Sequence, residues 1–245
     1  MPTLTSIENP KVKFVQQLHH KKYRTQHNKF IAEGLNVCKT LLKSKVPLYA
    51  FFITEEHLEM IKNIIPEDKI NVINQKILSK ISLATTPSGI VGVFEIPEPK
   101  AELSEGVALA QIQDPGNMGT LIRTAAAMKL KTFITVEGVD PWSPKVVQAT
   151  AGTIGMLDIF ELNWKQLLNK KESLKLCALV VKGGKDEKQL KFKNTILVIG
   201  NEANGIPKEW VRDCEEKLTL HMPGKTESLN AAVAGSIAMY LAFSK

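Results

Sequence analysis

The chain has 245 residues, an apolar fraction of 44%, a charged fraction of 23% and a net charge of +7 at pH 7. This length allows one large domain or two small ones with a substantial core, and the basic balance favours an anionic partner. Its three cysteines are far apart, which excludes a disulfide framework and a zinc spacing and suits a reducing compartment. The longest apolar run, residues 231–243, is too short for a membrane span, and the N-terminus lacks a signal-peptide core. We therefore expect a cytoplasmic protein with no membrane partner.

The N-terminal part is basic over a short stretch. Between Asn9 and Ala32 there are six lysines and arginines, three histidines and no acid. Such a stretch is either a phosphate-facing patch or a solvated helix face, and both interpretations stay open. If it is a patch, the candidate phosphate contacts are Lys21, Lys22 and Arg24.

Residues 1–98 are predicted to form a small α/β domain. A helix begins at Asn9-Pro10, and the other predicted helices are residues 35–42 and 55–64. The predicted strands are residues 30–32, 48–53, 70–73 and 90–96. Residues 95–105, with two prolines and four acids, are the best candidate for a linker to a second domain.

The second domain, residues 106–245, alternates strand-like and helix-like runs regularly. The predicted strands are residues 107–112, 132–136, 157–162, 176–181, 195–199 and 217–221. The predicted helices are residues 119–128, 144–149, 164–170, 208–213 and 228–242. This alternation predicts a parallel sheet with crossover helices, and the mostly apolar strands 107–112 and 195–199 are typical of strands buried on both faces.

Three polar segments follow predicted strands of the second domain, at residues 113–127, 197–205 and 221–234. Loops at the carboxyl ends of strands are where open α/β sheets bind ligands. The usual nucleotide motifs are absent from these segments. Gly224-Lys225-Thr226 lacks the glycine that a P-loop needs at position 219, and no Gly-x-Gly-x-x-Gly follows the first strand. We therefore do not expect a conventional dinucleotide or ATP site.

Each segment has a chemical and a purely structural interpretation. In the first, Gly119 at the predicted helix start would let an anion approach the free N–H groups, with Arg123 one turn later. In the second, Glu202 follows a strand between two glycines; in the third, Ser228 and Asn230 start a hydrophobic helix. Singly, these are also ordinary turns and helix caps. Three such segments in this order are hard to explain as independent turns.

The three segments resemble the motifs of the SpoU (TrmH-like) RNA ribose 2′-O-methyltransferases of the SPOUT superfamily. The similar stretches are Asp114-Pro115-Gly116-Asn117-Met118-Gly119 with Arg123, Gly200-Asn201-Glu202-Ala203-Asn204-Gly205, and Met222-Pro223-Gly224 with Glu227-Ser228-Leu229-Asn230. The resemblance covers residues 106–245. Residues 7–13 and 30–34 are similar to the family's L30e-like substrate-binding domain.

The resemblance implies a deep trefoil knot at the C-terminus, which is rare among folds, and a homodimer whose active site is completed at the subunit interface. It implies that S-adenosylmethionine binds in the knot and meets mostly backbone. The cofactor-binding residues carried over are Ile199, Gly200, Leu220, Met222 and Leu229. No metal is implied.

The implied reaction is attack of an RNA ribose hydroxyl on the sulfonium methyl group. Arg123 matches the family's catalytic arginine, and Asn117, Glu202, Ser228 and Asn230 match the polar residues that orient it and the nucleotide. Because arginine stays protonated in proteins, we favour charge stabilisation by Arg123, with action as a base left open. In this interpretation Lys21, Lys22 and Arg24 contact RNA. Ribosomal RNA is the favoured substrate, and the alternatives are transfer RNA or a non-catalytic RNA-binding protein that keeps the fold.

Overall fold

The computed structural model describes residues 3–99, 102–224 and 229–244, and it has the predicted α/β architecture. The chain divides into two compact units. The first comprises residues 1–97 and 142–155, and the second comprises residues 98–141 and 156–245.

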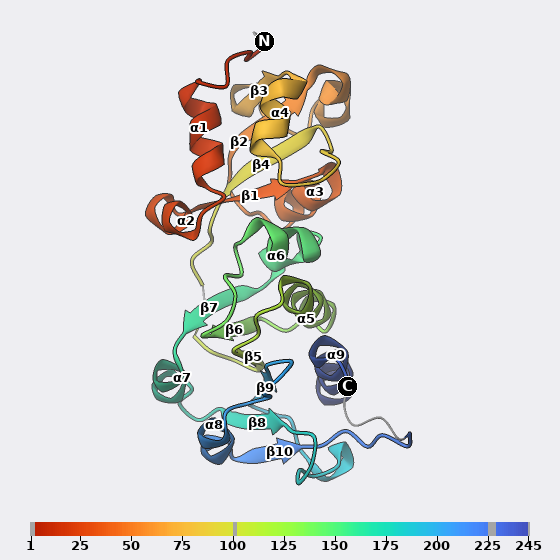
Figure 1. The fold of residues 1–245 in the computed structure, drawn as a ribbon. Coiled ribbons are helices and arrows are strands. Elements are labelled where there is room, and N and C mark those ends of the chain that lie inside the picture. The colour runs from red at the N-terminus through yellow and green to blue at the C-terminus, as the bar shows by residue number, and fades with distance from the viewer. Residues whose placement is uncertain (1–2, 100–101, 225–228, 245) are drawn as a thin grey trace. The chain divides into compact units, whose positions relative to one another are not determined.

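The first unit contains a mixed sheet, which has four strands in the described residues, in the order β1-β4-β2-β3 (Figure 1). Its strands are β1 (Lys29–Glu33), β2 (Leu48–Thr54), β3 (Ile70–Ile73) and β4 (Ile90–Glu95). β4 pairs antiparallel with β1 and β2, whereas β2 and β3 are parallel. Its helices are α1 (Pro10–Gln17), α2 (Lys21–His27), α3 (Leu35–Lys43), α4 (Gln75–Ile81) and α6 (Pro144–Ala149). The expected helix over residues 55–64 is instead a 3-10 helix, Glu55–Ile61.

Helix α6 belongs to the first unit although it follows β6 in sequence. It packs on β1, and the ring of Trp142 lies 4.9 Å from the ring of Phe30. Gly152 approaches the carbonyl oxygen of Val37 so closely that an added Cβ would lie 2.5 Å from it. The sequence placed residues 142–155 with the second domain, and only these tertiary contacts assign them to the first unit.

The second unit contains an all-parallel sheet, which has six strands among the described residues, in the order β10-β8-β9-β5-β6-β7. The strands are β5 (Gly106–Ala110), β6 (Thr132–Val136), β7 (Asp158–Leu162), β8 (Lys175–Leu179), β9 (Thr195–Gly200) and β10 (Glu216–Leu218). The helices are α5 (Pro115–Ala127), α7 (Trp164–Lys170), α8 (Lys208–Asp213) and α9 (Ala231–Phe243). The prediction of a parallel sheet with crossover helices is confirmed.

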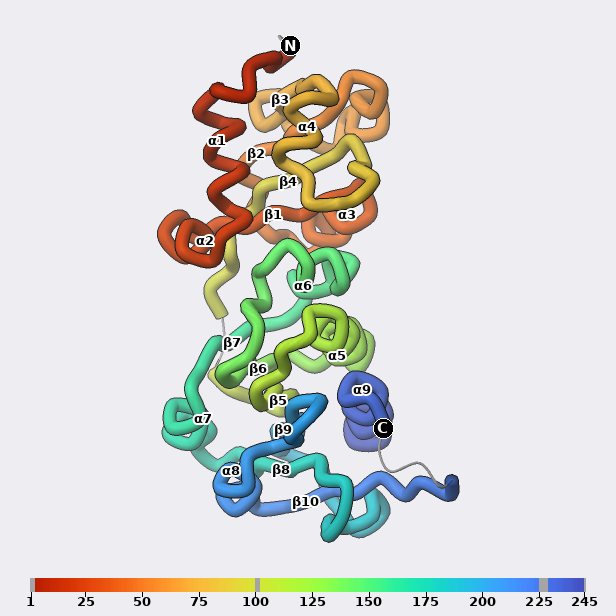
Figure 2. Tube along the Cα trace, viewed as in Figure 1, coloured from red at the N-terminus to blue at the C-terminus, as the bar shows by residue number. Residues whose placement is uncertain are grey.

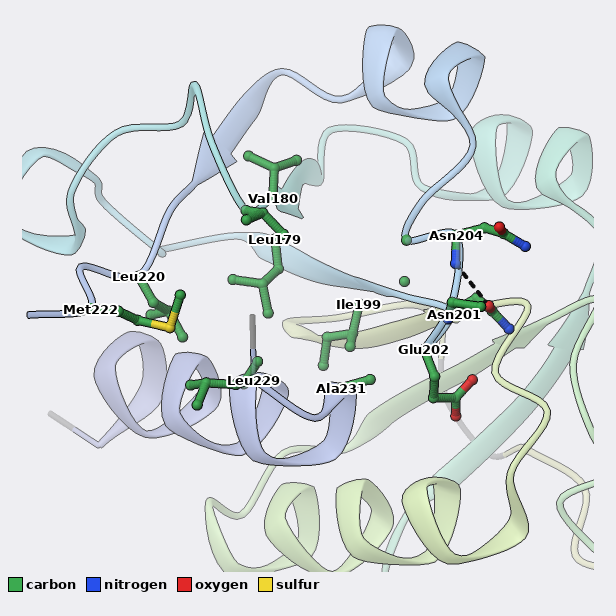
Figure 3. Close-up of a pocket in the computed structure, with 15 residues that line it drawn as sticks. Leu179, Val180, Ile199, Asn201, Glu202, Asn204, Leu220, Met222, Leu229 and Ala231 are labelled. Atoms are coloured by element: carbon green, nitrogen blue, oxygen red, sulfur yellow. Dashed lines mark hydrogen bonds between the residues drawn. The ribbon is translucent and has the colours of Figure 1, made fainter. Parts of the chain in front are cut away.

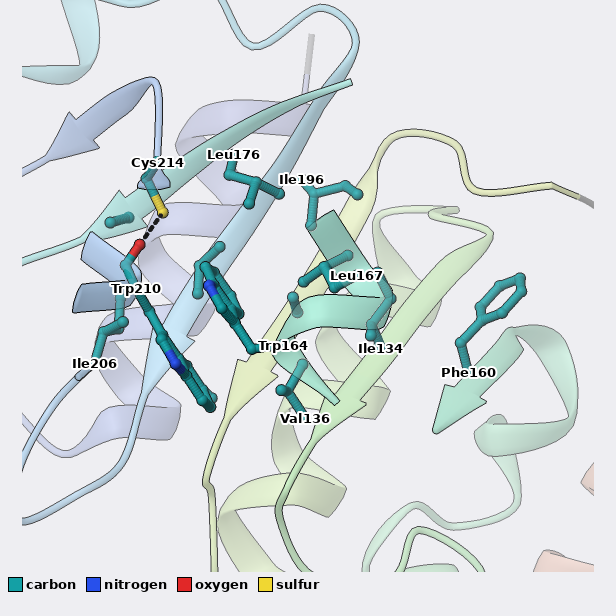
Figure 4. Close-up of a cluster of buried hydrophobic side chains, with 14 residues drawn as sticks. Ile134, Val136, Phe160, Trp164, Leu167, Leu176, Ile196, Ile206, Trp210 and Cys214 are labelled. Carbon is teal, nitrogen blue, oxygen red and sulfur yellow. Dashed lines mark hydrogen bonds between the residues drawn. The ribbon is translucent and has the colours of Figure 1, made fainter. Parts of the chain in front are cut away.

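Helices cover both faces of this sheet, and α5 and α9 lie side by side on one of them (Figures 1 and 2). On the other face, α7 and α8 pack on alternate residues of the strands, including Ala108, Ile134 and Val198. There the rings of Trp164 and Trp210 stack with centroids 4.7 Å apart (Figure 4). Burial on both faces explains why these strands are continuously apolar.

Candidate active site

The carboxyl ends of β5 and β9 lie next to each other, because the two strands pair in parallel with Ala110 opposite Gly200. The loop after β9 is fixed to the end of β5 by Asn201, whose Nδ2 donates to the carbonyl oxygen of Gln111 at 2.8 Å. The Oδ1 atom of Asn201 accepts from the backbone N–H groups of Ala203 and Asn204. Glu202 is therefore held on an ordered turn beside the first polar segment.

Helix α5 begins at Pro115, four residues before the predicted start at Gly119. Asp114 is the N-cap and accepts from the backbone N–H of Asn117 at 2.7 Å, and proline at the first helical position is preorganised for the helix. The stretch Asp114-Pro115-Gly116-Asn117 is therefore the start of a helix. The predicted anion site at Gly119 is wrong, because Gly119 is buried inside the helix and its N–H is not at the free end.

Helix α9 begins after Asn230, which is its N-cap. The Oδ1 atom of Asn230 accepts from the backbone N–H groups of Ala232 and Val233 at 2.8 and 3.2 Å. The cap of α9 is therefore Asn230. Ser228 itself lies outside the described residues.

Three of the predicted catalytic residues form a continuous hydrogen-bonded chain. The Nδ2 of Asn230 donates to Oδ1 of Asn117 at 3.1 Å, and the Nδ2 of Asn117 donates to Oε1 of Glu202 at 2.8 Å. Each residue comes from a different polar segment, so the fold joins all three at one place. We call Asn230, Asn117 and Glu202 the amide–carboxylate chain.

Arg123 is not part of this chain. It lies about two turns into α5, on the exposed face that also carries Gly116 and Thr120. Within the described residues it makes no hydrogen bond or ion pair. The expected orientation of Arg123 by neighbouring polar residues is thus not seen among the described residues, where its side chain is exposed.

A cavity of about 330 Å³ opens beside the amide–carboxylate chain. All five residues predicted to bind the cofactor, Ile199, Gly200, Leu220, Met222 and Leu229, line it. Figure 3 shows the apolar side chains of Leu220, Met222 and Leu229 toward one end and Asn201, Glu202 and Asn204 toward the other. Sequence reasoning missed the lining by residues 179–181, 201 and 203–205, and by Ala231 and Ala234. The position of residues 179–181 at the carboxyl end of β8 was a usable signal.

The lining has the character of a small-molecule site, with apolar walls and few polar groups, and its volume falls in the usual range of about 300–1,000 Å³. Glu202 is the one ionisable side chain among the described lining residues, which suits a cationic ligand. Local packing requires glycine at position 200, because an added Cβ would lie 2.4 Å from backbone atoms of Gly205 and Ile206. This glycine shapes the loop that forms the cavity wall.

The three cysteine thiols are unsuited to nucleophilic chemistry. The cysteines Cys38, Cys177 and Cys214 are buried, and burial raises the pKa of each thiol to about 12. None of them is a thiolate nucleophile near neutral pH.

Among the described residues no group of three or more His, Cys, Asp or Glu is arranged to hold a metal ion. In the same residues no helix is long and apolar enough to cross a membrane.

The candidate RNA contacts lie in the first unit, and one of them is a correction. Lys21 and Lys22 are exposed on α2. Arg24 is buried, with 4% of its surface exposed, and its Nη1 donates to the carbonyl oxygens of Leu18 and His19 at 2.8 Å. Its guanidinium group closes the end of α1, so Arg24 is not a surface contact for phosphate.

Comparison with known families agrees with this geometry. The model of the SpoU rRNA methylase family matches residues 106–240, which include every residue of the amide–carboxylate chain and of the cavity lining. The chain belongs to the SpoU rRNA methylase family. The recognition made from the three polar segments is confirmed, and the chain is an RNA methyltransferase. Residues 9–92 match the MRM3-like substrate binding domain.

Some relatives of this SpoU protein match nearly the whole chain, and others match part of it. It is 29% identical to the 23S rRNA (guanosine(2553)-2′-O)-methyltransferase RlmP of Bacillus subtilis, over 98% of both chains. It is 32% identical to the human mitochondrial rRNA methyltransferase 3, over 60% of this chain and 38% of the human protein. Among solved structures, the AdoMet-bound rRNA methyltransferase from Sinorhizobium meliloti superposes with a TM-score of 0.84 at 29% identity, covering 98% of this chain and 96% of that one.

Proposed function

We propose that this chain transfers a methyl group from S-adenosylmethionine to a ribose 2′-hydroxyl of ribosomal RNA. The observation that carries the proposal is the amide–carboxylate chain, which reaches the edge of the cavity through Glu202. RlmP is a 2′-O-methyltransferase of 23S rRNA and the S. meliloti rRNA methyltransferase binds AdoMet, which supports the same reaction and the same methyl donor.

The cavity fits the methyl donor. Apolar walls from Leu179, Leu220 and Leu229 suit the adenine ring, and backbone groups of residues 199–205 offer hydrogen bonds that need no acidic ribose-binding side chain. The carboxylate of Glu202 complements the positive charge of the ligand. When bound, S-adenosylmethionine supplies a methyl group on a cationic sulfur that is open to attack by an oxygen.

The chain's own residues have the task of orienting a weak nucleophile. Asn117 cannot rotate freely, because its amide nitrogen is held by Glu202 and its oxygen by Asn230. This fixed chain presents polar groups at the cavity edge that position the ribose, and Ser228 is proposed to join it. Arg123 stabilises the negative charge that develops on the attacking oxygen and positions the phosphate.

We further propose that two copies of the chain form the complete active site. Val233, Ile237 and Tyr240 recur on one face of α9 and are 47%, 41% and 60% exposed. Three large apolar side chains in one helical stripe are typical of an interface. Among the described residues Arg123 makes no hydrogen bond or ion pair, which fits a role completed by the second copy. A closed two-fold dimer is the commonest solution for such a surface.

The domain roles follow the same proposal. Residues 1–98 would bind the RNA substrate as an L30e-like domain, and residues 106–245 would carry out methyl transfer. A trefoil knot in the second unit is proposed from the family resemblance, and it agrees with β10 at the sheet edge and α9 packed on β9. A ribosomal RNA substrate is in line with the cytoplasmic location expected from the sequence.

The test is methyl transfer in vitro from radiolabelled S-adenosylmethionine to purified ribosomal RNA and, separately, transfer RNA. We expect label in ribosomal RNA only, and mapping of 2′-O-methyl groups after gene deletion should show one site lost. Label confined to transfer RNA would overturn the choice of substrate. Cofactor binding without transfer to any RNA would identify a non-catalytic RNA-binding protein.

A further inference from the structure

Five aromatic side chains form a continuous surface on the first unit, outside the site described above. They come from three elements: Phe14 from α1, His20, Tyr23 and His27 from α2 and the residue before it, and Tyr49 from the start of β2. His20, Tyr23 and His27 recur at the spacing that places side chains on one face of a helix. We call these five residues the ring surface.

The rings touch in a single series. The Tyr23 and His27 rings are nearly parallel, at 12° with centroids 6.5 Å apart, and His20 lies 6.4 Å from Tyr23. Phe14 meets His27 edge-on at 5.1 Å and lies 5.6 Å from Tyr49. The series therefore runs from α2 across α1 to β2 without a gap.

Lysines accompany the ring surface at both ends. The Lys22 ammonium lies 5.7 Å from the centre of the Tyr23 ring, and the Lys29 ammonium lies 4.5 Å from that of Tyr49. The stretch from residue 9 to residue 32 contains no acid. Aromatic faces beside positive charge, with no acid within this stretch, complement a polyanion that carries flat rings.

The rings are all at least partly exposed, and one of them, Phe14, also packs against the core of the unit. Tyr49 is 45% exposed, His20 is exposed, and the other three are half-buried. By contrast, Phe30 and Phe94, which stack in the core of the same unit, are fully buried. Rings that only filled a core would follow the second pattern.

We propose that the ring surface binds unpaired nucleotides of the RNA substrate by stacking bases on its aromatic side chains, with Lys22 and Lys29 beside the backbone phosphates. This inference rests on the proposed function, because it supplies the substrate contact of an RNA methyltransferase. Bases in a duplex are stacked on one another and cannot reach the rings, so single-stranded loops are the ligand and double-stranded RNA is not.

The first experiment needs no variant. A short single-stranded RNA that contains the fluorescent base 2-aminopurine is titrated with the full-length protein. Stacking on Tyr or His rings quenches this fluorescence, and we expect quenching with the single strand and not with the same RNA annealed to its complement. Equal binding of the duplex, or binding of the single strand with unchanged fluorescence, would overturn the proposal.

The second experiment compares matched variants. Tyr23→Leu with Tyr49→Leu removes two ring faces, and Tyr23→Phe with Tyr49→Phe keeps them. The leucine variant should bind the single strand at least about 5-fold more weakly, whereas the phenylalanine variant should bind like the wild type. The log–log salt dependence should be the same in all three proteins, because no phosphate contact changes. Equal affinity of the leucine and wild-type proteins contradicts stacking.

Two controls separate this proposal from the proposed function. S-adenosylmethionine affinity reports whether the leucine variant is folded, and a variant that fails this test is replaced by Tyr49→Leu alone at the more exposed position. Methyl transfer to ribosomal RNA by the wild type tests the proposed function itself. If the wild type is active and all variants bind RNA with equal affinity, only the stacking proposal is contradicted. If quenching is clear but no methyl group is transferred, only the proposed enzymatic function is contradicted.

Discussion

Asn117 and Glu202 are joined by a 2.8 Å hydrogen bond although 85 residues separate them in the chain. The bond exists because β5 and β9 pair in parallel, which places the start of α5 and the turn after β9 at the same edge of the sheet. Asn201 holds that turn on the end of β5, so the carboxylate of Glu202 reaches the amide with little freedom to move.

This pairing predicts coupled effects on catalysis. Asn117→Ala and Glu202→Ala should each lower kcat roughly 5- to 30-fold, the size of one to two kcal/mol for a hydrogen bond to a charged group at a partly exposed site. The double variant should lose little more than either single one, because both changes break the same bond. Steady-state kinetics of the four proteins measures this. Gln113→Ala, in the same segment but outside the chain of bonds, is the control, and fully additive losses would contradict the coupling.

Arg123→Ala should reduce methyl transfer at least about 100-fold, the usual effect of removing one group that stabilises developing charge. Its affinity for S-adenosylmethionine should be unchanged, because Arg123 does not line the cavity. Transfer assays and calorimetry measure the two quantities. Arg212→Ala, another exposed arginine of the second unit, should behave as wild type. Near-normal turnover of the Arg123→Ala variant would show that Arg123 has no role in the mechanism.

Ala234→Leu should block the cofactor cavity from the side of α9. Ala234 lines the cavity, and the larger side chain would have to be accommodated at a cost of about 1–3 kcal/mol. We expect S-adenosylmethionine to bind roughly tenfold or more weakly by calorimetry. Ala242→Leu adds the same side chain to the same helix away from the cavity and should leave binding intact. If Ala234→Leu binds normally, the cofactor lies elsewhere.

The exposed stripe on α9 predicts a dimer. Light scattering should give about twice the chain mass of 27.1 kDa. Val233→Glu with Ile237→Glu should shift the protein toward a monomer and abolish transfer, because charges would be buried in the interface. Leu83→Glu, at an equally exposed apolar side chain of the first unit, should remain dimeric. A wild-type monomer at micromolar concentration argues against a shared active site.

Arg24→Ala should destabilise the first unit. Loss of the guanidinium group removes donors from the carbonyl oxygens of Leu18 and His19 in a buried setting, which costs about 2–4 kcal/mol of unfolding free energy. Arg24→Lys should not restore it fully, since the lysine side chain is one atom shorter and does not place its nitrogen where Nη1 lies. Urea unfolding followed by circular dichroism provides the measurement. Lys22→Ala should stay within about 0.5 kcal/mol of wild type, and unchanged stability of the alanine variant at position 24 would contradict the structural role.

The sequence by itself determined the strands, the parallel sheet and the three polar segments. Continuous apolar runs such as residues 195–199 report burial on two faces, and that signal is local. The family motifs identified the cavity side chains as well, and all five predicted cofactor residues line one cavity. These features depend on residue type and spacing along the chain, so they can be recognised before the fold is known.

The tertiary structure decided the features of the protein that depend on long-range contacts. Arg24 stands in a basic stretch that predicts a phosphate patch, and only the position of the α1 carbonyl groups shows that it is an internal contact. The helix over residues 21–27 was not predicted, because it buries this arginine instead of an apolar stripe. Likewise, the amide–carboxylate chain depends on strand order, and the ring surface depends on α1, α2 and β2 meeting in space. Spacing along the chain encodes the period of an element, but the partners across elements are set by how the elements pack.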